Sequence, residues 1–386
     1  MNNIRRQTRC TVIIGAGAAV EASEEMSGLR IDTTTITKSL YDKPSGYNVY
    51  KWSRVFEILI KEQGGSNCCN FEIIYEMLIE AWDDLWKGRS NKLIELIRSF
   101  GSDEEDHNYI YGLIQYLLST IMKAVNCYNE KYPLGWFNDF ISMLEELNDC
   151  NIYFDFCILN YDTMIEKSLK NYNDGFIRAY KAPDYPDEYS TFNLKKALEF
   201  KNQNFVCHPH GCVNYAGHLM NRPHGDSELC LWDHCIATSS ETIQCLYTNS
   251  EKQMMSPIVT GHNKSRNFHY EPFTTYMDII NGRMCDNDSM IIIGYGFGDK
   301  HINNVVEKYG AGSGKHFIMI SPINKELQKR VRCVCGYEIP QTEGIWKSTD
   351  GNAVCYIGGF KKATEDAVFL EMVKELLKKR EMTCNK

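Results

Sequence analysis

The sequence predicts an α/β protein built on a Rossmann-like parallel sheet with helices on both faces, interrupted by an inserted all-helical module. Short apolar runs that are typical of buried strands alternate with amphipathic segments, as in parallel sheets covered on both faces. Between residues 51 and 148, apolar residues recur at three- and four-residue spacing, which indicates helices alone. We therefore predict a Rossmann-type domain of residues 1–50 and 151–386 and an inserted helical module of residues 51–150.

The predicted elements follow one another along the chain in a simple order. Strand-like runs lie at 10–20, 152–160, 205–213, 289–299, 315–322 and 352–359. Outside the helical module, helical spacing occurs at 300–308, 323–331 and 362–380, and residues 239–285 combine helix and loop. The polar segment 23–37 is expected to be a loop.

Composition and charge narrow the class of protein. The chain has 386 residues, of which 43% are hydrophobic, enough for one large domain or two of ordinary size. Its net charge of −8 argues against direct nucleic-acid binding. No run of 18 apolar residues occurs, and MNNIRRQTRC passes into TVIIGAG without a secretory signal. We expect a soluble, cytoplasmic protein that does not bind a membrane.

The sixteen cysteines do not have the spacing of a zinc site. No CxxC pair occurs in the sequence, so the knuckles of a zinc ribbon are missing. Cys157, Cys207 and Cys355 lie inside apolar strand-like runs, where a reduced thiol acts as a small hydrophobic group. We expect reduced core cysteines and no metal.

Four predicted strands end in glycine or polar residues. These ends are Gly15-Ala16-Gly17-Ala18, Asn160-Tyr161-Asp162, His208-Pro209-His210 and Gly294-Tyr295-Gly296. The carboxyl ends of parallel strands lie along one edge of a sheet, where open α/β sheets bind ligands. Each end also has a plainer explanation: Asp162 is suited to capping the next helix, and a buried histidine is often structural. The first loop lacks the third glycine of a dinucleotide fingerprint, because position 20 is Val.

Taken together, these motifs resemble the sirtuin-like domains, and most closely the branch found in bacterial antiphage defence. The resemblance covers residues 10 to 322, and its most specific segments are LNYDTMIE (159–166) and IIIGYGFGDKHIN (291–303), supported by YNDGF (172–176) and PIVTGHNKS (257–265). The chain lacks the zinc module and the Pro-Asp-Phe-Arg stretch of protein-deacetylating sirtuins. The resemblance therefore implies an NAD⁺ glycohydrolase that yields nicotinamide and ADP-ribose, with NAD as its substrate.

The resemblance also assigns roles to particular residues. Asn160 is expected to orient the ribose and the attacking water, and His210 to bond the ribose hydroxyls or act as base, with His208 as its rival. Asp162 is expected near the nicotinamide. The implied NAD-binding residues are Gly15, Ala16, Gly17 and Ala18 at the phosphates, Thr33 and Thr34 on a covering loop, Gly294, Tyr295 and Gly296 at the adenosine ribose, and Ser321 near the adenine.

An NAD-destroying enzyme must be controlled, and the resemblance implies control by assembly. The stretch after residue 322 is too short for a separate sensor domain of usual size. No GxxxxGK[ST] motif occurs, so ATP hydrolysis would come from a partner. We expect a homo-oligomer that works with a HerA-type hexameric ATPase in abortive infection. Alternatives are an NAD-dependent protein deacylase and a non-catalytic NAD or ADP-ribose sensing subunit of an ATPase/nuclease complex.

Overall fold

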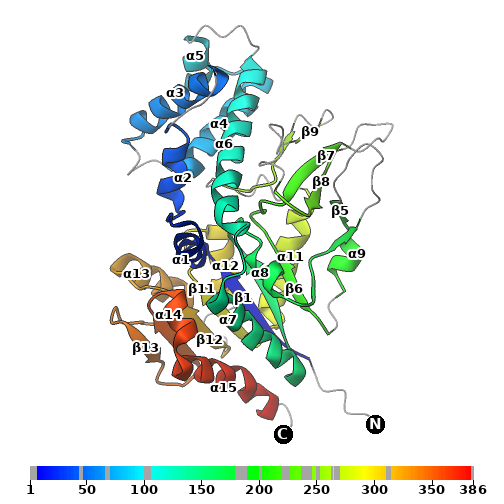
Figure 1. Ribbon diagram of the computed structural model, residues 1–386, viewed down its shortest axis with the longest axis vertical. Coiled ribbons are helices and arrows are strands. Elements are labelled where there is room, and N and C mark those ends of the chain that lie inside the picture. Colours follow the sequence, from blue (N-terminus) through cyan, green and yellow to red (C-terminus); the bar gives the residue numbers. More distant parts are fainter. Residues whose placement is uncertain are drawn as a thin grey trace.

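The computed structural model of the chain describes residues 7–42, 47–65, 70–99, 106–178, 189–199, 202–219, 227–235, 246–248, 253–261, 264, 270–309 and 314–383. Its centre is an eight-stranded sheet with the strand order β13-β14-β12-β11-β1-β2-β6-β3 (Figure 1). The strands are β1 (Thr8–Ile14), β2 (Ile152–Ile158), β3 (Tyr172–Asn173), β6 (Asn204–Cys207), β11 (Ser289–Ile293), β12 (His316–Ile320), β13 (Gly344–Lys347) and β14 (Ala353–Ile357). All neighbours are parallel except β13, which runs antiparallel to β14. The predicted Rossmann-like sheet is confirmed, with one antiparallel edge strand added.

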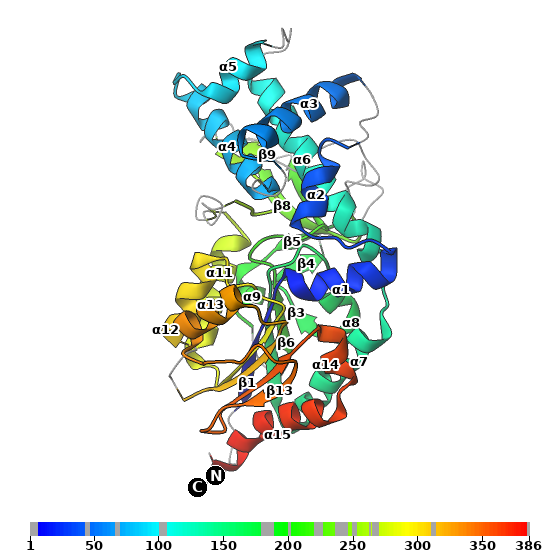
Figure 2. The ribbon, with the colours of Figure 1, turned by 90° about the vertical axis from the view of Figure 1, so that its left-hand side faces the viewer.

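The sheet is buried on both faces because its strands are apolar at nearly every position. In β1, Val12 and Ile14 pack into one core while Ile13 packs into the other. The first face is covered by α1 (Ala16–Ser27), α7 (Gly135–Glu146), α14 (Phe360–Glu365) and α15 (Ala367–Thr383). The second is covered by α11 (Phe273–Asp286), α12 (Lys300–Tyr309) and α13 (Lys325–Cys335), and Figure 2 shows α11 to α13 on the side of the sheet opposite α1, α7 and α14.

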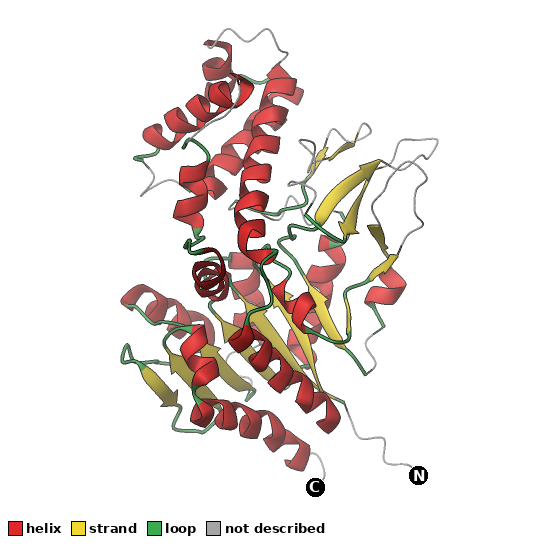
Figure 3. Cartoon of the chain, viewed as in Figure 1, coloured by secondary structure: helices red, strands yellow, loops and turns green. Residues whose placement is uncertain are grey.

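Helices alone occupy the described part of the chain between β1 and β2. Besides α1 and α7 they are α2 (Thr33–Ser39), α3 (Tyr47–Glu62), α4 (Phe71–Trp86), α5 (Lys92–Ser99), α6 (Asp106–Asn129) and the 3₁₀ turn η1 (Leu147–Cys150). Figure 3 shows that α3, α4, α5 and most of α6 extend beyond the sheet. The hydrophobic core of these helices is nevertheless continuous with one face of the sheet. The boundaries at residues 51 and 150 stay a prediction.

Two further groups of strands were not predicted from the sequence. A four-stranded antiparallel sheet has the order β4-β5-β8-β7, and β9 pairs with β10. Their bounds are β4 (Phe176–Arg178), β5 (Tyr189–Phe192), β7 (Tyr215–Leu219), β8 (Ser227–Trp232), β9 (Leu246–Thr248) and β10 (Gln253–Met255); the short helices α8 (Met164–Ser168) and α9 (Leu194–Ala197) complete the fold.

The polar segment 23–37 is not a loop, so that expectation was wrong. Helix α1 continues to Ser27, and α2 begins at Thr33. Asp32 caps α2, because its carboxylate accepts a hydrogen bond from the backbone N–H of Thr35 at 2.9 Å. Gly28 ends α1 in the left-handed conformation with φ 70°. The polar composition of this segment suggested a loop, but it contains the end of α1 and the capped beginning of α2.

No helix in the described ranges is both long and apolar enough to span a membrane. The cysteines whose surroundings are described carry free thiols.

A buried ion pair links β1 and β2 away from their polar carboxyl ends. Arg9 on β1 donates from Nε to both carboxylate oxygens of Asp155 on β2, at 3.0 and 3.1 Å. The amide of Asn287 donates to the same carboxylate at 2.9 Å. Because both charges are buried, each depends on the other for compensation.

We predict that Asp155→Asn lowers the free energy of unfolding by about 3–5 kcal/mol, because it removes the carboxylate that pairs with the buried Arg9 charge. Chemical denaturation followed by circular dichroism measures this change. Glu57→Gln is the matched control, since it breaks only the exposed ion pair with Lys61 on α3 and should leave the denaturation midpoint unchanged. Equal midpoints for all three proteins would contradict the prediction.

Candidate active site

The carboxyl ends of β1, β2, β6 and β11 meet at one edge of the sheet. From β1, the sheet continues through β2 and β6 on one side and through β11 and β12 on the other. Connections that leave neighbouring strands in opposite directions open a crevice at such an edge, where α/β proteins bind ligands. The topology thus directs attention to the segments that follow these four strands.

A cavity of about 920 Å³ lies at this edge. Its volume is within the range of small-molecule sites. Among the residues predicted from the sequence, those that line it are Gly15, Ala16, Gly17, Thr33, Asn160, His210, Gly294, Tyr295 and Gly296. Four others do not line it: Ala18, Thr34, Asp162 and Ser321.

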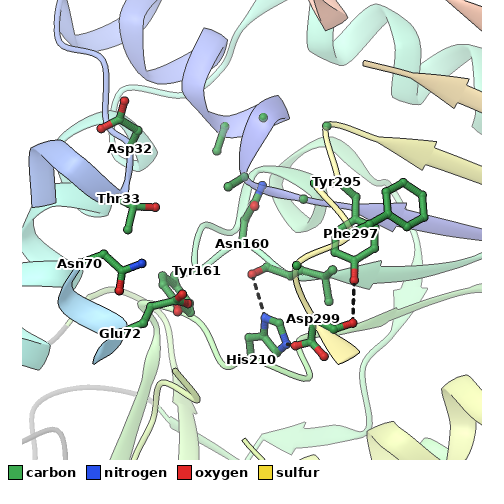
Figure 4. Close-up of a pocket in the computed structure, with 18 of the residues that line it drawn as sticks. Asp32, Thr33, Asn70, Glu72, Asn160, Tyr161, His210, Tyr295, Phe297 and Asp299 are labelled. Carbon is green, nitrogen blue, oxygen red and sulfur yellow. Dashed lines mark hydrogen bonds and ion pairs between the residues drawn. The ribbon is translucent and has the colours of Figure 1, made fainter. Parts of the chain in front are cut away.

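The cavity also has a wall that the sequence did not predict. Asn70, Phe71 and Glu72 from the beginning of α4 line it, as does Tyr128 from α6. In Figure 4, Asn70 and Glu72 lie on the opposite side of the drawn pocket from Asp299 and Tyr295. Helices from the insertion therefore complete a site that the strand ends begin.

Three glycines bring the loop after β1 into direct contact with the turn after β11. The N–H of Gly15 donates to Ile293 O, and the N–H of Gly17 donates to Gly294 O, both at 2.9 Å. A Cβ on Gly15 would lie 2.6 Å from the Cα of Tyr295, and one on Gly17 would lie 2.9 Å from the Cα of Gly294. These glycines are needed for the close approach of two backbones.

The same hydrogen bonds limit what the loop can offer to a phosphate. The N–H groups of Gly15 and Gly17 are already bonded, and that of Ala18 donates to Gly15 O at 3.1 Å. Within the described chain, the N–H of Ala16 is the one amide of this loop with no protein acceptor. Ala16 is the first residue of the twelve-residue helix α1, so its N–H lies at the positive end of the helix dipole.

Asn160 is buried with an amide that makes no hydrogen bond to the described residues. It follows β2, is 6% exposed and lines the cavity. Neither its amide nitrogen nor its amide oxygen has a partner in the part of the chain that the structure describes. An unpaired buried polar group costs about 1–3 kcal/mol, so native proteins keep few of them. Such a group at a cavity wall indicates a ligand-binding role.

Asp162 lies two residues further along but belongs to the protein interior. Its carboxylate accepts hydrogen bonds from the hydroxyl of Tyr128 on α6 at 3.1 Å and from the N–H of Met164 at 3.3 Å. Burial raises the pKa of this carboxyl, although the bond from Met164 opposes the change. The N-cap of α8 is Thr163, so Asp162 lies one residue before the cap, although its carboxylate still accepts from the first N–H of that helix. Asp162 does not line the cavity.

The two histidines after β6 have different surroundings. His208 is buried, pairs through Nε2 with Glu166, and does not line the cavity. His210 lines the cavity, with Nδ1 at 3.3 Å from Leu159 O and Nε2 at 2.9 Å from the carboxylate of Asp299. Of these two rivals, only His210 faces the same space as Asn160.

Asp299 and Lys264 are functional candidates that the sequence analysis did not select. The Nζ atom of Lys264 lies 3.0 Å from Asp299 Oδ2 and 3.4 Å from His210 Nε2, and both residues line the cavity. Burial raises the pKa of Asp299, but hydrogen bonds and charges from His210 and Lys264 outweigh it and hold that pKa well below its usual range. Both residues lie inside quoted motifs, GYGFGD and PIVTGHNKS, and residues 262, 263 and 265 of the second motif lie outside the described ranges.

The end of the cavity beyond Gly294 is aromatic and polar. The ring of Tyr295 packs against that of Phe297 with a centroid distance of 4.8 Å. The Tyr295 hydroxyl donates to Asn303 Oδ1 at 2.7 Å and is buried. Ser321 follows β12 nearby but is buried away from the cavity, and its N–H donates to Tyr356 O.

No cluster of metal-ligating side chains occurs among the residues that the structure describes.

Comparison with known proteins finds a family similar to part of the chain. Residues 157–335 match the family model described as "SIR2-like domain", and this stretch contains Asn160, His210, Lys264, Gly294 and Asp299. No curated protein matches the chain. Residues 157–335 are therefore similar to a SIR2-like domain, and this similarity agrees with the sirtuin-like resemblance of the motifs.

Solved structures of Sir2 homologues resemble the chain weakly. An ADP-ribose complex of a mutant Sir2 homologue has 12% identity and a TM-score of 0.43 and covers 98% of this chain and 99% of its own. An NAD complex of a Sir2 homologue has 11% identity and a TM-score of 0.41, and the match covers 97% of this chain and 92% of the homologue. At these scores the structural likeness adds nothing to the family match.

We predict that Gly294→Ala strongly destabilises the protein. Gly294 has φ 60°, and a Cβ there would lie 2.3 Å from the backbone nitrogen of Ala18. The two segments cannot keep their contact, and we expect a loss of more than about 1–3 kcal/mol of unfolding free energy.

Gly296→Ala is the matched control for this prediction, since a Cβ at that position meets no atom within 4 Å. Thermal unfolding should separate the two variants clearly. Equal melting temperatures would show that the contact between the two glycine segments is dispensable.

Proposed function

We propose that the protein is an NAD⁺ glycohydrolase, which converts NAD⁺ and water to nicotinamide and ADP-ribose. The observation that carries the proposal is the buried, unpaired amide of Asn160 at the same cavity as His210, inside the match to the SIR2-like domain. A cavity of this size with a few convergent polar groups is the usual form of a small-molecule site.

The chemistry of the reaction suits this set of side chains. When the nicotinamide–ribose bond breaks, nicotinamide leaves as a neutral pyridine and positive charge develops on the ribose. An acid for the leaving group is therefore unnecessary, and the enzyme must instead position water and stabilise the developing charge. The amide of Asn160 offers both a donor and an acceptor for a ribose hydroxyl or the attacking water. His210 provides a nitrogen base in the same cavity.

Glu72 supplies the cavity with a carboxylate that can face the developing positive charge. It lies on α4, in the wall opposite Asp299, whose own charge is paired with Lys264. The carboxylate of Glu72 accepts a hydrogen bond from the Thr260 hydroxyl at 3.4 Å, and its charge acts on His210. Carboxylates fixed in a water-poor site favour a cationic transition state more than they would in bulk water.

Incubation of the purified protein with NAD⁺ tests the proposal directly. Mass spectrometry of the products should find nicotinamide and ADP-ribose, and a cyclised ADP-ribose would be distinguished by its mass. The same reaction with an acylated peptide distinguishes a deacylase, which would produce O-acyl-ADP-ribose. Binding of NAD⁺ without any nicotinamide release would instead indicate a sensing subunit.

We predict that Asn160→Ala and His210→Ala each reduce nicotinamide release at least about 100-fold. Asn160→Ala should not lower the melting temperature, because it removes an unpaired buried amide. Chromatography of released nicotinamide and thermal unfolding of the same samples measure the two effects.

Asn281→Ala and His234→Ala are the matched controls, since neither side chain lines the cavity. Both should keep the wild-type rate. Wild-type rates in a folded Asn160→Ala, His210→Ala double variant would refute the assignment.

We further propose that the enzyme depletes NAD in a bacterial antiphage system and is controlled by assembly with a HerA-type hexameric ATPase. Support comes from the resemblance of the motifs to that branch and from the need to restrain an enzyme that destroys NAD. Glu72 and Tyr128, which lie on inserted helices and line the cavity, give a partner bound to those helices a direct route to the site.

This proposal predicts a homo-oligomer whose NAD cleavage changes when the ATPase binds. Multi-angle light scattering measures the assembly, and nicotinamide release with and without the ATPase measures its effect. In infected cells that express both proteins, NAD should fall with the wild-type chain and persist with Asn160→Ala. A stable monomer, alone and with the ATPase, would contradict the proposal.

A further inference from the structure

We propose that Asp299 and Lys264 are positioning residues for His210: Asp299 holds the ring proton on Nε2, which leaves Nδ1 as the basic nitrogen, and Lys264 keeps the ring uncharged. The inference rests on the proposed function for its catalytic meaning, but its structural content concerns these three side chains alone.

The geometry around the ring selects one tautomer. Nε2 lies 2.9 Å from Asp299 Oδ2, and Nδ1 lies 3.3 Å from Leu159 O. Both of these oxygens are acceptors, so a neutral ring donates to only one of them, and the ammonium of Lys264 lies 3.4 Å from Nε2 as a donor. The contact of Nε2 with Asp299 is shorter than its contact with Lys264 and shorter than that of Nδ1 with Leu159 O, and charge-assisted hydrogen bonds are about twice as strong as neutral ones. The proton therefore lies on Nε2.

This tautomer directs the free lone pair toward the segment that carries Asn160. Figure 4 shows the ring of His210 beside Asp299, and Nδ1 contacts the carbonyl of Leu159, the residue that directly precedes Asn160. A carboxylate bonded to one ring nitrogen orients a histidine base and fixes its tautomer. The other nitrogen of His210, Nδ1, contacts Leu159 O in this structure. Asp299 is itself oriented, because its second oxygen caps α12 through the N–H of His301 at 2.8 Å.

Lys264 determines the charge of the cluster. Its Nζ is paired with Asp299 at 3.0 Å and lies 3.4 Å from His210 Nε2, and its side chain is only 12% exposed. One carboxylate and one ammonium already balance, so protonation of the ring would leave a net positive charge in a buried site. Burial and the Lys264 charge lower the pKa of His210, against the opposing effects of Asp299 and Glu72.

Substitutions at the two positions should move the titration of His210 in opposite directions. Lys264→Met removes the neighbouring cation and should raise the titration midpoint by about one pH unit or more, whereas Lys264→Arg should keep it near wild type. Asp299→Asn removes the anion, retains an oxygen for the cap of α12, and should lower the midpoint. The groups that face His210 from other elements, Glu72 on α4 and Leu159 O after β2, are unchanged in every variant.

Nuclear magnetic resonance of histidine-labelled protein without ligand tests the inference independently of any activity. The His210 signals are assigned by their loss in His210→Asn. Nitrogen chemical shifts should report the Nε2–H tautomer in the wild type. The titration midpoint of His210 should be highest in Lys264→Met, intermediate in the wild type and lowest in Asp299→Asn. An Nδ1–H tautomer in the wild type, or midpoints that shift in the same direction, would overturn the proposal.

The pH dependence of nicotinamide release gives the second readout. If neutral His210 is the base, the acidic limb of the rate profile should follow the same order as the titration midpoints. The expected titrations without any nicotinamide release would leave the inference intact and reject the proposed function. If Asp299→Asn does not fold, Lys264→Met compared with Lys264→Arg still decides the question, because it leaves the cap of α12 untouched.

Discussion

The contact between the loop after β1 and the turn after β11 is the constraint on which the site depends. Gly15, Gly17 and Gly294 allow two backbones to approach at hydrogen-bonding distance, and a side chain on any of them would collide with the other segment. This contact fixes the beginning of α1 and the course of the chain from Gly294 to Asp299. The Ala16 N–H and the Asp299 carboxylate, at opposite ends of this arrangement, are thereby fixed relative to each other.

The site combines features that cost stability with others that limit the cost. The unpaired amide of Asn160 disfavours the folded state, and the surrounding apolar core stabilises it by far more. The charges behind His210 are arranged differently, since Asp299 and Lys264 compensate each other within 3.0 Å. The amide without a described partner thus lies where a ligand would bind, and the charged groups next to His210 are paired with each other.

Sequence reasoning predicted the sheet and the ends of its strands because both have local signals. Apolar runs that stop at glycine or at polar residues identify the strand ends near Gly15, Asn160, His210 and Gly294, and the topology brings all four to one edge. Glu72 had no such signal, because on an amphipathic helix it is indistinguishable from any exposed carboxylate. Lys264 and Asp299 lay within recognised motifs, but a pairing across 35 positions of sequence requires the folded chain.

The glycine loop shows the opposite limit of sequence reasoning. Its composition suggested that Gly15 and Gly17 permit a pyrophosphate to approach, whereas the backbone that approaches them is that of Gly294 and Tyr295. Both requirements select glycine, so the residue type alone cannot separate them. The hydrogen bonds separate them, because they leave the Ala16 N–H as the amide of that loop with no acceptor among the described residues.

The last turn of α6 connects the inserted helices to Asn160. Tyr128 donates to Asp162, and the Asn129 side chain both accepts from the Thr163 N–H at 3.0 Å and donates to its hydroxyl at 3.1 Å. Through these bonds, α6 fixes the position of the residues immediately after Asn160. The same helix packs against α4 and α5. A displacement of α6 along its axis would have to break them or carry the Asn160 segment with it. Since α4 supplies Glu72 to the opposite wall, movement of these helices changes both sides of the cavity together.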